Sequence, residues 1–263
     1  MDDGGEEGRQ MDKIERIKHI VEALRGENGC PWDKRQTPKT IKNYLLEEAY
    51  ELVDAIERGS HQAIKEELGD LLFLIVFLAY LYEEVGKFDL KNVIDTVEEK
   101  MIRRHPHVFG GVKVRDEREI RIRWQKIKSE EKLQSSILDG IPKALPALML
   151  AYKVGSRAAT VGFDWQRAED VILKVEEEIE EFKRALKQGN RDRIEEELGD
   201  ILFSCVNLAR LLNIQPEEAL RKTVYKFKDR FQFIEKRLRE QGKDLEETSL
   251  KEMDALWERA KDI

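Results

Sequence analysis

A duplicated acidic pattern constrains the fold of this chain more than any other feature. Residues 66–73 read EELGDLLF, and residues 196–203 read EELGDILF, an offset of 130 positions. The same offset, without a gap, relates the acidic and glycine positions before this segment: Glu47, Glu48, Glu51 and Gly59 recur as Glu177, Glu178, Glu181 and Gly189. A match in register across an intervening turn indicates two equivalent structural units in one chain.

The composition of both units favours helices. Only 16 Gly and 6 Pro occur among 263 residues, and Glu, Lys, Leu, Ile and Arg dominate, as is usual for a helical protein. In each unit we expect a helix near 41–57 or 168–187, a glycine turn, a helix near 61–85 or 191–212, and a third helix that holds Lys100 or Lys226. The predicted fold class is all-α, with two tandem helical-bundle domains.

Composition also indicates where the domains begin and end. Residues 1–11 are acidic and Gly-rich with almost no apolar side chains, so we expect a disordered tail. The first helical domain is predicted over 12–135 and the second over 136–263. Between the repeated patterns we expect a break at Phe109-Gly110-Gly111 and a charged helix over 116–134 that contains Trp124. Pro142 and Pro146 then introduce the second domain.

Several classes of protein are disfavoured by the sequence. The net charge is -7, whereas duplex DNA-binding proteins usually carry a basic excess, so no duplex nucleic acid partner is expected. The longest apolar run, residues 71–81, is too short to span a membrane, and no secretory signal is apparent. Cys30 and Cys205 form no CxxC pattern, which fits a cytoplasmic protein. No P-loop and no GxSxG motif is present.

The repeated acidic residues are spaced so that they share helix faces. Glu48 and Glu51 are three residues apart, as are Glu67 and Asp70, and two antiparallel helices can bring both pairs together. No residue four positions after these carboxylates is basic, so we expect no counter-ion on the same helix. The second unit repeats the pattern with Glu178, Glu181, Glu197 and Asp200. The alternative is an ordinary solvated acidic face.

Carboxylates that lack a counter-ion beside an apolar stripe favour a bound divalent cation. Oxygen ligands without His or Cys are typical of Mg²⁺, with Mn²⁺ as the alternative, and Mg²⁺ often completes its coordination with phosphate oxygens. This pattern predicts a phosphate ester substrate. Gly69 and Gly199 lie between the acidic residues, where we expect a close approach of the neighbouring helix; tight packing without any chemistry is the other interpretation.

Basic residues follow each acidic cluster. Lys100 and Arg104 are four apart, as are Lys226 and Arg230, so each pair lies on one helix face and could bind phosphate groups. A solvated basic face is the alternative. Asn207 lies seven residues after Asp200 on nearly the same face, where it could bind a sugar or base, and the first unit has Phe77 at this position. We therefore expect the second unit to be the better catalyst.

The tandem EExxE and ELGD patterns resemble those of the MazG family of nucleoside triphosphate pyrophosphohydrolases. The segments GCPWD at 29–33, RRHPHVF at 103–109 and VGFDW at 161–165 are similar to further signatures of that family. The resemblance implies an all-α homodimer, related to dimeric dUTPases, in which Mg²⁺ is held by the second and third Glu of EExxE and by Glu and Asp of ExxD. On this chain these ligands are Glu48, Glu51, Glu67, Asp70, Glu178, Glu181, Glu197 and Asp200.

The resemblance also implies substrate contacts. The nucleotide contacts of the family fall on Lys226, Arg230 and Trp257, with Lys100 and Arg104 as counterparts in the first unit and Trp124 as a candidate counterpart of Trp257. Glu177 and Glu196 are further substrate-binding candidates, and Glu47 or Glu177 could accept the proton of the attacking water.

The implied reaction is hydrolysis of nucleoside triphosphates to monophosphate and pyrophosphate, by attack of a metal-activated water on the α-phosphorus. One alternative is a non-catalytic helical scaffold that senses nucleotides or regulates a partner. Another is a prenyl-diphosphate enzyme, although the DDxxD pattern of those enzymes is absent. A homodimer is also expected because the run 71–81 is apolar around its whole circumference and needs cover on all sides.

Overall fold

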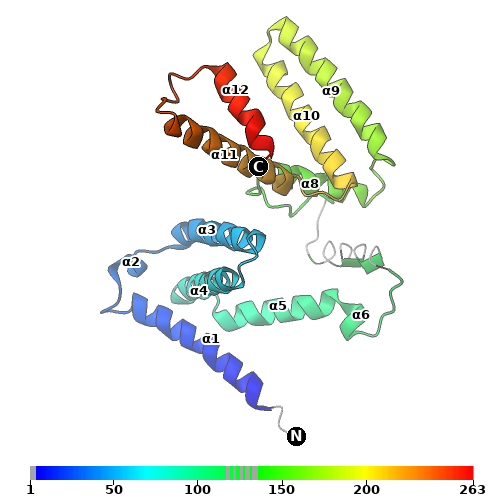
Figure 1. Ribbon diagram of the computed structural model, residues 1–263. Helices are drawn as coiled ribbons and strands as arrows, with labels where there is room; N and C mark the ends of the chain where they lie inside the picture. The colour runs from blue at the N-terminus through cyan, green and yellow to red at the C-terminus, as the bar shows by residue number, and fades with distance from the viewer. Residues whose placement is uncertain are drawn as a thin grey trace. The chain divides into compact units, whose positions relative to one another are not determined.

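The computed structural model describes residues 4–116, 119, 120, 123, 124, 127, 131 and 136–262, and the side chains from residue 13 to residue 261 within these ranges. The chain divides into two compact units, Met1–Asp116 (unit 1) and Glu117–Ile263 (unit 2) (Figure 1). This division assigns residues 117–135 to unit 2, whereas the sequence assigned them to the first domain. Residues 4–11 of the predicted disordered tail lie within the first helix, which begins at Gly4, whereas the predicted charged helix over 116–134 lies largely outside the described residues, so the boundary near residue 135 stays a prediction.

Unit 1 is built around a helical hairpin. Its elements are α1 (Gly4–Arg25), α2 (Pro31–Lys34), α3 (Pro38–Glu57), α4 (His61–Glu84), α5 (Leu90–Arg104) and α6 (Pro106–Phe109). The Thr37 side chain caps α3 by accepting a hydrogen bond from the backbone N–H of Thr40. Gly59, with a φ of +68°, then reverses the chain in a conformation that glycine adopts readily, and Ser60 caps α4. This tight turn places α3 and α4 side by side.

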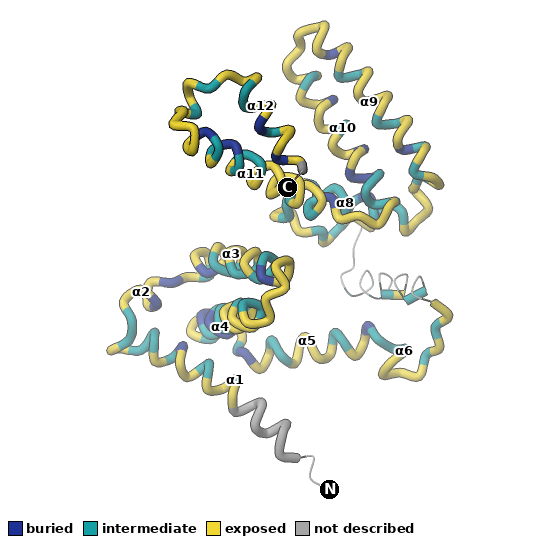
Figure 2. The backbone as a smooth tube through the Cα atoms, in the orientation of Figure 1, coloured by how far each residue is buried: buried dark blue, intermediate teal, exposed yellow. Residues whose placement is uncertain are grey.

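The core of unit 1 lies where α1, α3, α4 and the start of α5 meet. Its buried members are Val21, Ile41, Val76, Phe77, Ala79, Leu81 and Leu90. Figure 2 shows buried positions alternating with exposed ones along these helices, as expected for amphipathic packing. The predicted apolar run on α4 is covered on one side only, because Leu72 and Ile75 remain 40% and 45% exposed.

Unit 2 repeats this hairpin. Its elements are α8 (Ala147–Ala159), α9 (Ala168–Gln188), α10 (Arg191–Leu211), α11 (Pro216–Glu240), α12 (Leu250–Arg259) and the 3₁₀ turn η1 (Ala260–Asp262). Gly189 closes α9 in the left-handed conformation, and Asn190 caps α10. Helix α8 packs on α10 as α1 packs on α4, and α11 packs on α12 around Ile234, Leu238 and Leu256.

The predicted fold class is confirmed, since the regular elements of the described residues are all helical. The predicted hairpin helices correspond to α3, α4, α9 and α10, and the predicted third helices are α5 and α11. Among the described helices, none combines the length and the hydropathy that a membrane span requires.

Candidate functional site

Three carboxylates converge at the hairpin of unit 1. Glu48 on α3 and Glu67 and Asp70 on α4 each bring one carboxylate oxygen within 4.8 Å of the others. Partial burial raises the pKa of Glu48, and the negative charges of Glu51, Asp70, Glu67 and Glu47 raise it further. All the charged groups that perturb Glu48 in this way are themselves acidic, so the cluster is a concentration of negative charge that a cation would neutralise.

Unit 2 has the same arrangement at the equivalent positions. Glu178 on α9 and Glu197 and Asp200 on α10 also place carboxylate oxygens within 4.8 Å of one another. Glu178 and Glu197 are more deeply buried than their unit 1 counterparts, with exposed fractions of 5% and 3%. Both clusters offer several oxygen donors, without nitrogen or sulfur, in a volume small enough for one hard ion. The residues therefore fit a divalent cation such as Mg²⁺.

Glu51 and Glu181 lie outside these close sets. Each sits almost one turn beyond Glu48 or Glu178 on the same helix, and Glu181 forms an ion pair with Arg184 at 3.0 Å. The structure thus brings together three of the four predicted ligands in each unit, and the role of the fourth stays a prediction.

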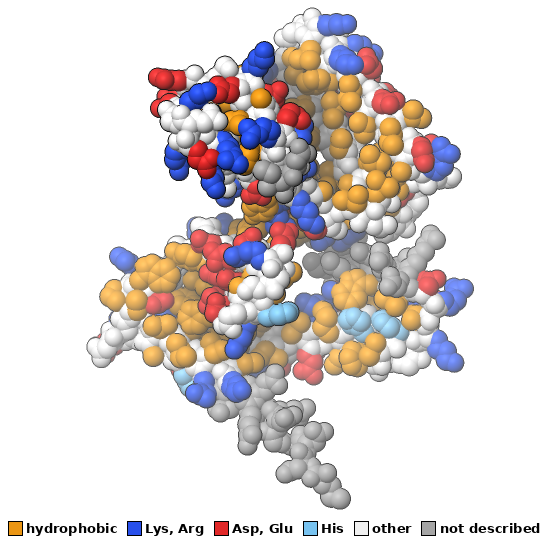
Figure 3. Space-filling view, in the orientation of Figure 1, with side chains coloured by type: hydrophobic (Ala, Val, Ile, Leu, Met, Phe, Trp, Pro, Cys, Tyr) orange, Lys and Arg blue, Asp and Glu red, His pale blue; other side chains and the backbone are white. Residues whose placement is uncertain are grey.

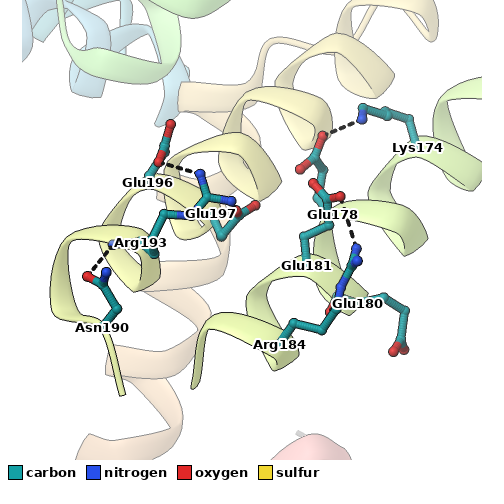
Figure 4. Close-up of polar contacts among 9 residues, drawn as sticks. All are labelled: Lys174, Glu178, Glu180, Glu181, Arg184, Asn190, Arg193, Glu196 and Glu197. Atoms are coloured by element: carbon teal, nitrogen blue, oxygen red, sulfur yellow. Dashed lines mark hydrogen bonds and ion pairs between the residues drawn. The ribbon is translucent and has the colours of Figure 1, made fainter. Parts of the chain in front are cut away.

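The expectation that these carboxylates lack helical counter-ions is wrong for unit 2. Lys174 contacts Glu178 at 2.8 Å, Arg193 contacts Glu197 at 2.6 Å, and Arg184 contacts Glu181. Figure 4 shows these basic side chains reaching the acidic ones along α9 and α10. They lie four residues before or three residues after their partners, so the residues four positions after the carboxylates did not reveal them.

The expectation for Gly69 and Gly199 is also wrong within the described chain. A Cβ added at either position would meet no atom within 4 Å, so no neighbouring helix approaches closely there. Instead, the short turn at Gly59 or Gly189 sets the two helices of each hairpin side by side and brings the carboxylates together.

A second group of predicted residues gathers on α11, α12 and η1. The guanidinium carbon of Arg230 lies 5.5 Å from the centre of the Trp257 ring, a distance typical of a cation–π contact. The Phe227 ring packs against Trp257 with centroids 5.0 Å apart. Beside them is an open cleft of about 380 Å³, to which α11 and η1 contribute the basic side chains Lys222, Lys226, Arg230 and Lys261. Three predicted nucleotide contacts are thus close together.

The unit 1 counterparts of Lys226 and Arg230 are less exposed to solvent. Lys100 is half-buried on α5, and Arg104, at the end of this helix, is 9% exposed. Trp124 lies among residues that are mostly outside the described part of the chain, so its correspondence to Trp257 stays a prediction.

Asn207 is engaged inside unit 2 instead of facing an open cleft. It is 2% exposed, its amide nitrogen donates to the Phe203 carbonyl at 3.2 Å, and its amide oxygen accepts from Arg210 Nε at 3.3 Å. A Cβ at Gly155 would come within 2.7 Å of this oxygen, so the missing side chain on α8 makes room for Asn207. These contacts indicate a packing role and do not support the predicted contact with a sugar or base.

The remaining acidic candidates lie on the surface. Glu47 and Glu177 are exposed, and Glu177 pairs with Lys174 at 3.0 Å. Glu196 is exposed and pairs with Arg193 at 2.9 Å. Their predicted catalytic and substrate-binding roles stay predictions.

Comparison with known proteins agrees with this duplicated architecture. The family described as "MazG nucleotide pyrophosphohydrolase domain" matches residues 36–109 and 166–232, and each segment contains one complete acidic hairpin. A protein of Escherichia coli strain K12 named "Nucleoside triphosphate pyrophosphohydrolase" is 44% identical over 257 residues, which cover 95% of this chain and 98% of that protein.

Two further relatives show the same extent of similarity along this chain. The Thermotoga maritima protein "Nucleoside triphosphate pyrophosphohydrolase/pyrophosphatase MazG" is 44% identical over 94% of this chain and 95% of its own length. The Bacillus subtilis "Uncharacterized protein YabN" is 45% identical over 94% of this chain but only 51% of its own length. With both acidic hairpins inside the matched segments, this chain belongs to the MazG nucleotide pyrophosphohydrolase family.

Proposed function

We propose that this chain hydrolyses nucleoside triphosphates to nucleoside monophosphate and pyrophosphate in a reaction that requires Mg²⁺, for which Mn²⁺ can substitute. The observation that carries this proposal is the carboxylate cluster, which recurs in both family-matched segments with its oxygens within 4.8 Å of one another. The names of the Escherichia coli and Thermotoga maritima relatives support the same reaction.

In unit 2 two groups of side chains would take part in this reaction, the carboxylate cluster on α9 and α10 and the basic cleft at α11 and η1. When bound, Mg²⁺ would offset the phosphate charge and lower the pKa of water. Glu178, Glu197 and Asp200 would hold the cation. Lys226 and Arg230 bind phosphate oxygens, and Trp257 offers a ring face to the base. Glu177 lies on the surface beside Glu178, where it can accept a proton from water.

No described hydrogen bond or ion pair joins the cleft at Trp257 to the carboxylate cluster, which suits a second copy of the chain completing the site. We propose a homodimer in which the exposed apolar stripes of the hairpins pair. On α4 the stripe is Leu68, Leu72 and Ile75, and on α10 it includes Leu198 and Leu202. Figure 3 shows hydrophobic side chains spread over the visible face of the α9–α10 hairpin.

Light scattering tests the dimer. The wild-type protein should have twice the 30.8 kDa mass of the chain, and Leu202→Glu, which places a charge in the stripe, should shift the protein toward the monomer. A wild-type mass of 30.8 kDa at micromolar concentration would exclude the proposed assembly.

The reaction is tested by measuring monophosphate and pyrophosphate from a panel of canonical and modified nucleoside triphosphates, with and without Mg²⁺. In water enriched in oxygen-18, attack at the α-phosphorus places the label in the monophosphate. Label found only in pyrophosphate, or release of a nucleoside diphosphate and inorganic phosphate, would contradict the proposal.

Variants of the cluster connect the reaction to these residues. Glu178→Gln and Asp200→Asn should each lower the turnover of unit 2 by at least about 100-fold, because a ligand is lost where charge develops. Circular dichroism should show unchanged helix content, since neither side chain forms the hairpin turn. Normal Mg²⁺-dependent turnover in both variants would show that the site lies elsewhere.

A further inference from the structure

Two basic side chains in unit 2 pair with carboxylates of the metal cluster, and a third pairs with Glu181, the fourth predicted ligand. Lys174 pairs with Glu178, Arg193 with Glu197 and Arg184 with Glu181, at 2.8, 2.6 and 3.0 Å. All three basic residues lie on the helices that carry the carboxylates, so each ion pair is made within one helix of the hairpin (Figure 4).

Unit 1 has no equivalent of these three cations. At the positions 130 residues earlier it has Tyr44, Asp54 and Ala63. Tyr44 packs its ring against Trp32, with centroids 5.5 Å apart, and Asp54 is itself paired with Arg58 at 2.9 Å. Among the residues that the structure describes, no ion pair engages Glu48, Glu51, Glu67 or Asp70.

This difference in ion pairing should change the free energy of metal binding in the two units. In unit 1 the ion meets carboxylates that repel one another, and its binding relieves that repulsion. In unit 2 the ion competes with ammonium and guanidinium groups for the same carboxylates, and their positive charge also repels it. Burial of Glu178 and Glu197 strengthens both the attraction and the competition, because charges interact more strongly away from water.

We propose that Lys174, Arg184 and Arg193 are built-in counter-ions that make unit 2 bind divalent metal more weakly than unit 1, so that the two units fill at different metal concentrations. This inference rests on the proposed function, in which both clusters bind metal. Lys174, Arg184 and Arg193 act here as tuning residues that set the metal affinity through their carboxylate partners.

The experiment is a Mn²⁺ titration of the metal-free full-length protein by calorimetry, with paramagnetic resonance of free Mn²⁺ as an independent reading. Glu67→Gln with Asp70→Asn leaves only unit 2 to bind, and Glu197→Gln with Asp200→Asn leaves only unit 1. We expect the dissociation constant of unit 2 to be at least about fivefold larger than that of unit 1, as several ion pairs must be given up.

Reciprocal substitutions test the cause. With unit 1 disabled, the combination Lys174→Met, Arg184→Met and Arg193→Met should tighten Mn²⁺ binding to unit 2 by about fivefold or more. With unit 2 disabled, Tyr44→Lys with Ala63→Arg should weaken binding to unit 1. Lys183→Met is the matched control, because Lys183 lies on the same helix but pairs with Glu180, outside the cluster. Circular dichroism verifies that each variant is folded.

The outcomes separate this inference from the proposed function. Equal affinities in the two units, or an unchanged unit 2 affinity in the triple variant, would overturn the inference while leaving both clusters as metal sites. Failure of both clusters to bind Mn²⁺ or Mg²⁺ would overturn the proposed function, and the inference with it.

Discussion

Small residues at the contact between α8 and α10 decide how this part of unit 2 packs. Gly155 leaves space that the Asn207 amide and the Arg210 side chain fill, and Arg210 continues to Asp164 in the loop before α9. Unit 1 uses the reverse arrangement, since Arg25 on α1 occupies the position equivalent to Gly155 and lies over the Phe77 ring of α4 at 5.6 Å. In unit 1 the arginine at this contact, Arg25, comes from α1, whereas in unit 2 it is Arg210 of α10.

We expect Gly155→Ala to destabilise the protein by about 1–3 kcal/mol, the usual cost of overpacking. The added methyl group would lie 2.7 Å from the Asn207 amide oxygen, and moving Asn207 disturbs the hydrogen bond to Arg210. Urea unfolding measures the change. Gly199→Ala is the control, because its Cβ would meet no atom within 4 Å, and here helix propensity should add up to about 1 kcal/mol of stability. Equal stability of Gly155→Ala and wild type would disprove this account of the contact.

Residues such as Asn207 show why the site could be predicted only in part from the sequence. The spacing of Glu48, Glu67 and Asp70 fixes which helix faces they occupy, and this was enough to predict the clusters that the hairpins form. A polar residue two turns further along has the same sequence signature whether it binds a ligand or another helix. Only the position of α8, which depends on contacts distant in sequence, distinguishes the two for Asn207.

At the scale of elements, ion pairs join α1 to the end of α4. Lys18 donates to Glu83 at 2.8 Å, and Arg25 pairs with Glu84 at 2.8 Å. The helix bounds of the hairpins were predictable because glycine turns and hydrophobic periodicity mark them locally. These pairs were not predictable, since 65 residues separate Lys18 from Glu83 and nothing local specifies which helices meet.

We expect Lys18→Met to reduce stability at neutral pH by about 0.5–1 kcal/mol, the range for a partly exposed ion pair. The hydrogen bond to Glu83 raises the pKa of Lys18 above its ordinary value of 10.5. A raised pKa means that the contribution is complete below pH 10.5 and is lost as the pH rises through the folded-state value. Urea unfolding should therefore show a gap between variant and wild type that narrows above pH 10.5. Lys13→Met, an exposed change on the same helix, should show no such gap.

At the scale of the whole molecule, the two units keep the same acidic hairpin but differ in what surrounds it. The carboxylates of unit 2 are more buried and are held by basic side chains, whereas those of unit 1 are uncompensated among the described residues. Unit 2 also presents Lys226 and Arg230 in an open cleft beside Trp257, whereas Arg104 of unit 1 is buried. A duplicated chain can thus retain two carboxylate clusters while only one of its units exposes the predicted nucleotide contacts in a cleft.

We therefore expect unit 2 to be the better catalyst of nucleoside triphosphate hydrolysis. The reason is the open cleft that holds Lys226 and Arg230, and it replaces the sequence argument from Asn207. Asp200→Asn should remove most of the turnover at saturating Mg²⁺ and substrate, by about tenfold or more, because a transition-state contact is lost where the nucleotide is best held. Asp70→Asn should leave most of it, since Arg104, the unit 1 counterpart of Arg230, is only 9% exposed. Trp257→Ala should raise KM with a smaller effect on kcat, as removal of a stacking contact weakens ground-state binding. A larger loss of turnover from Asp70→Asn than from Asp200→Asn would show that unit 1 is the principal catalytic unit.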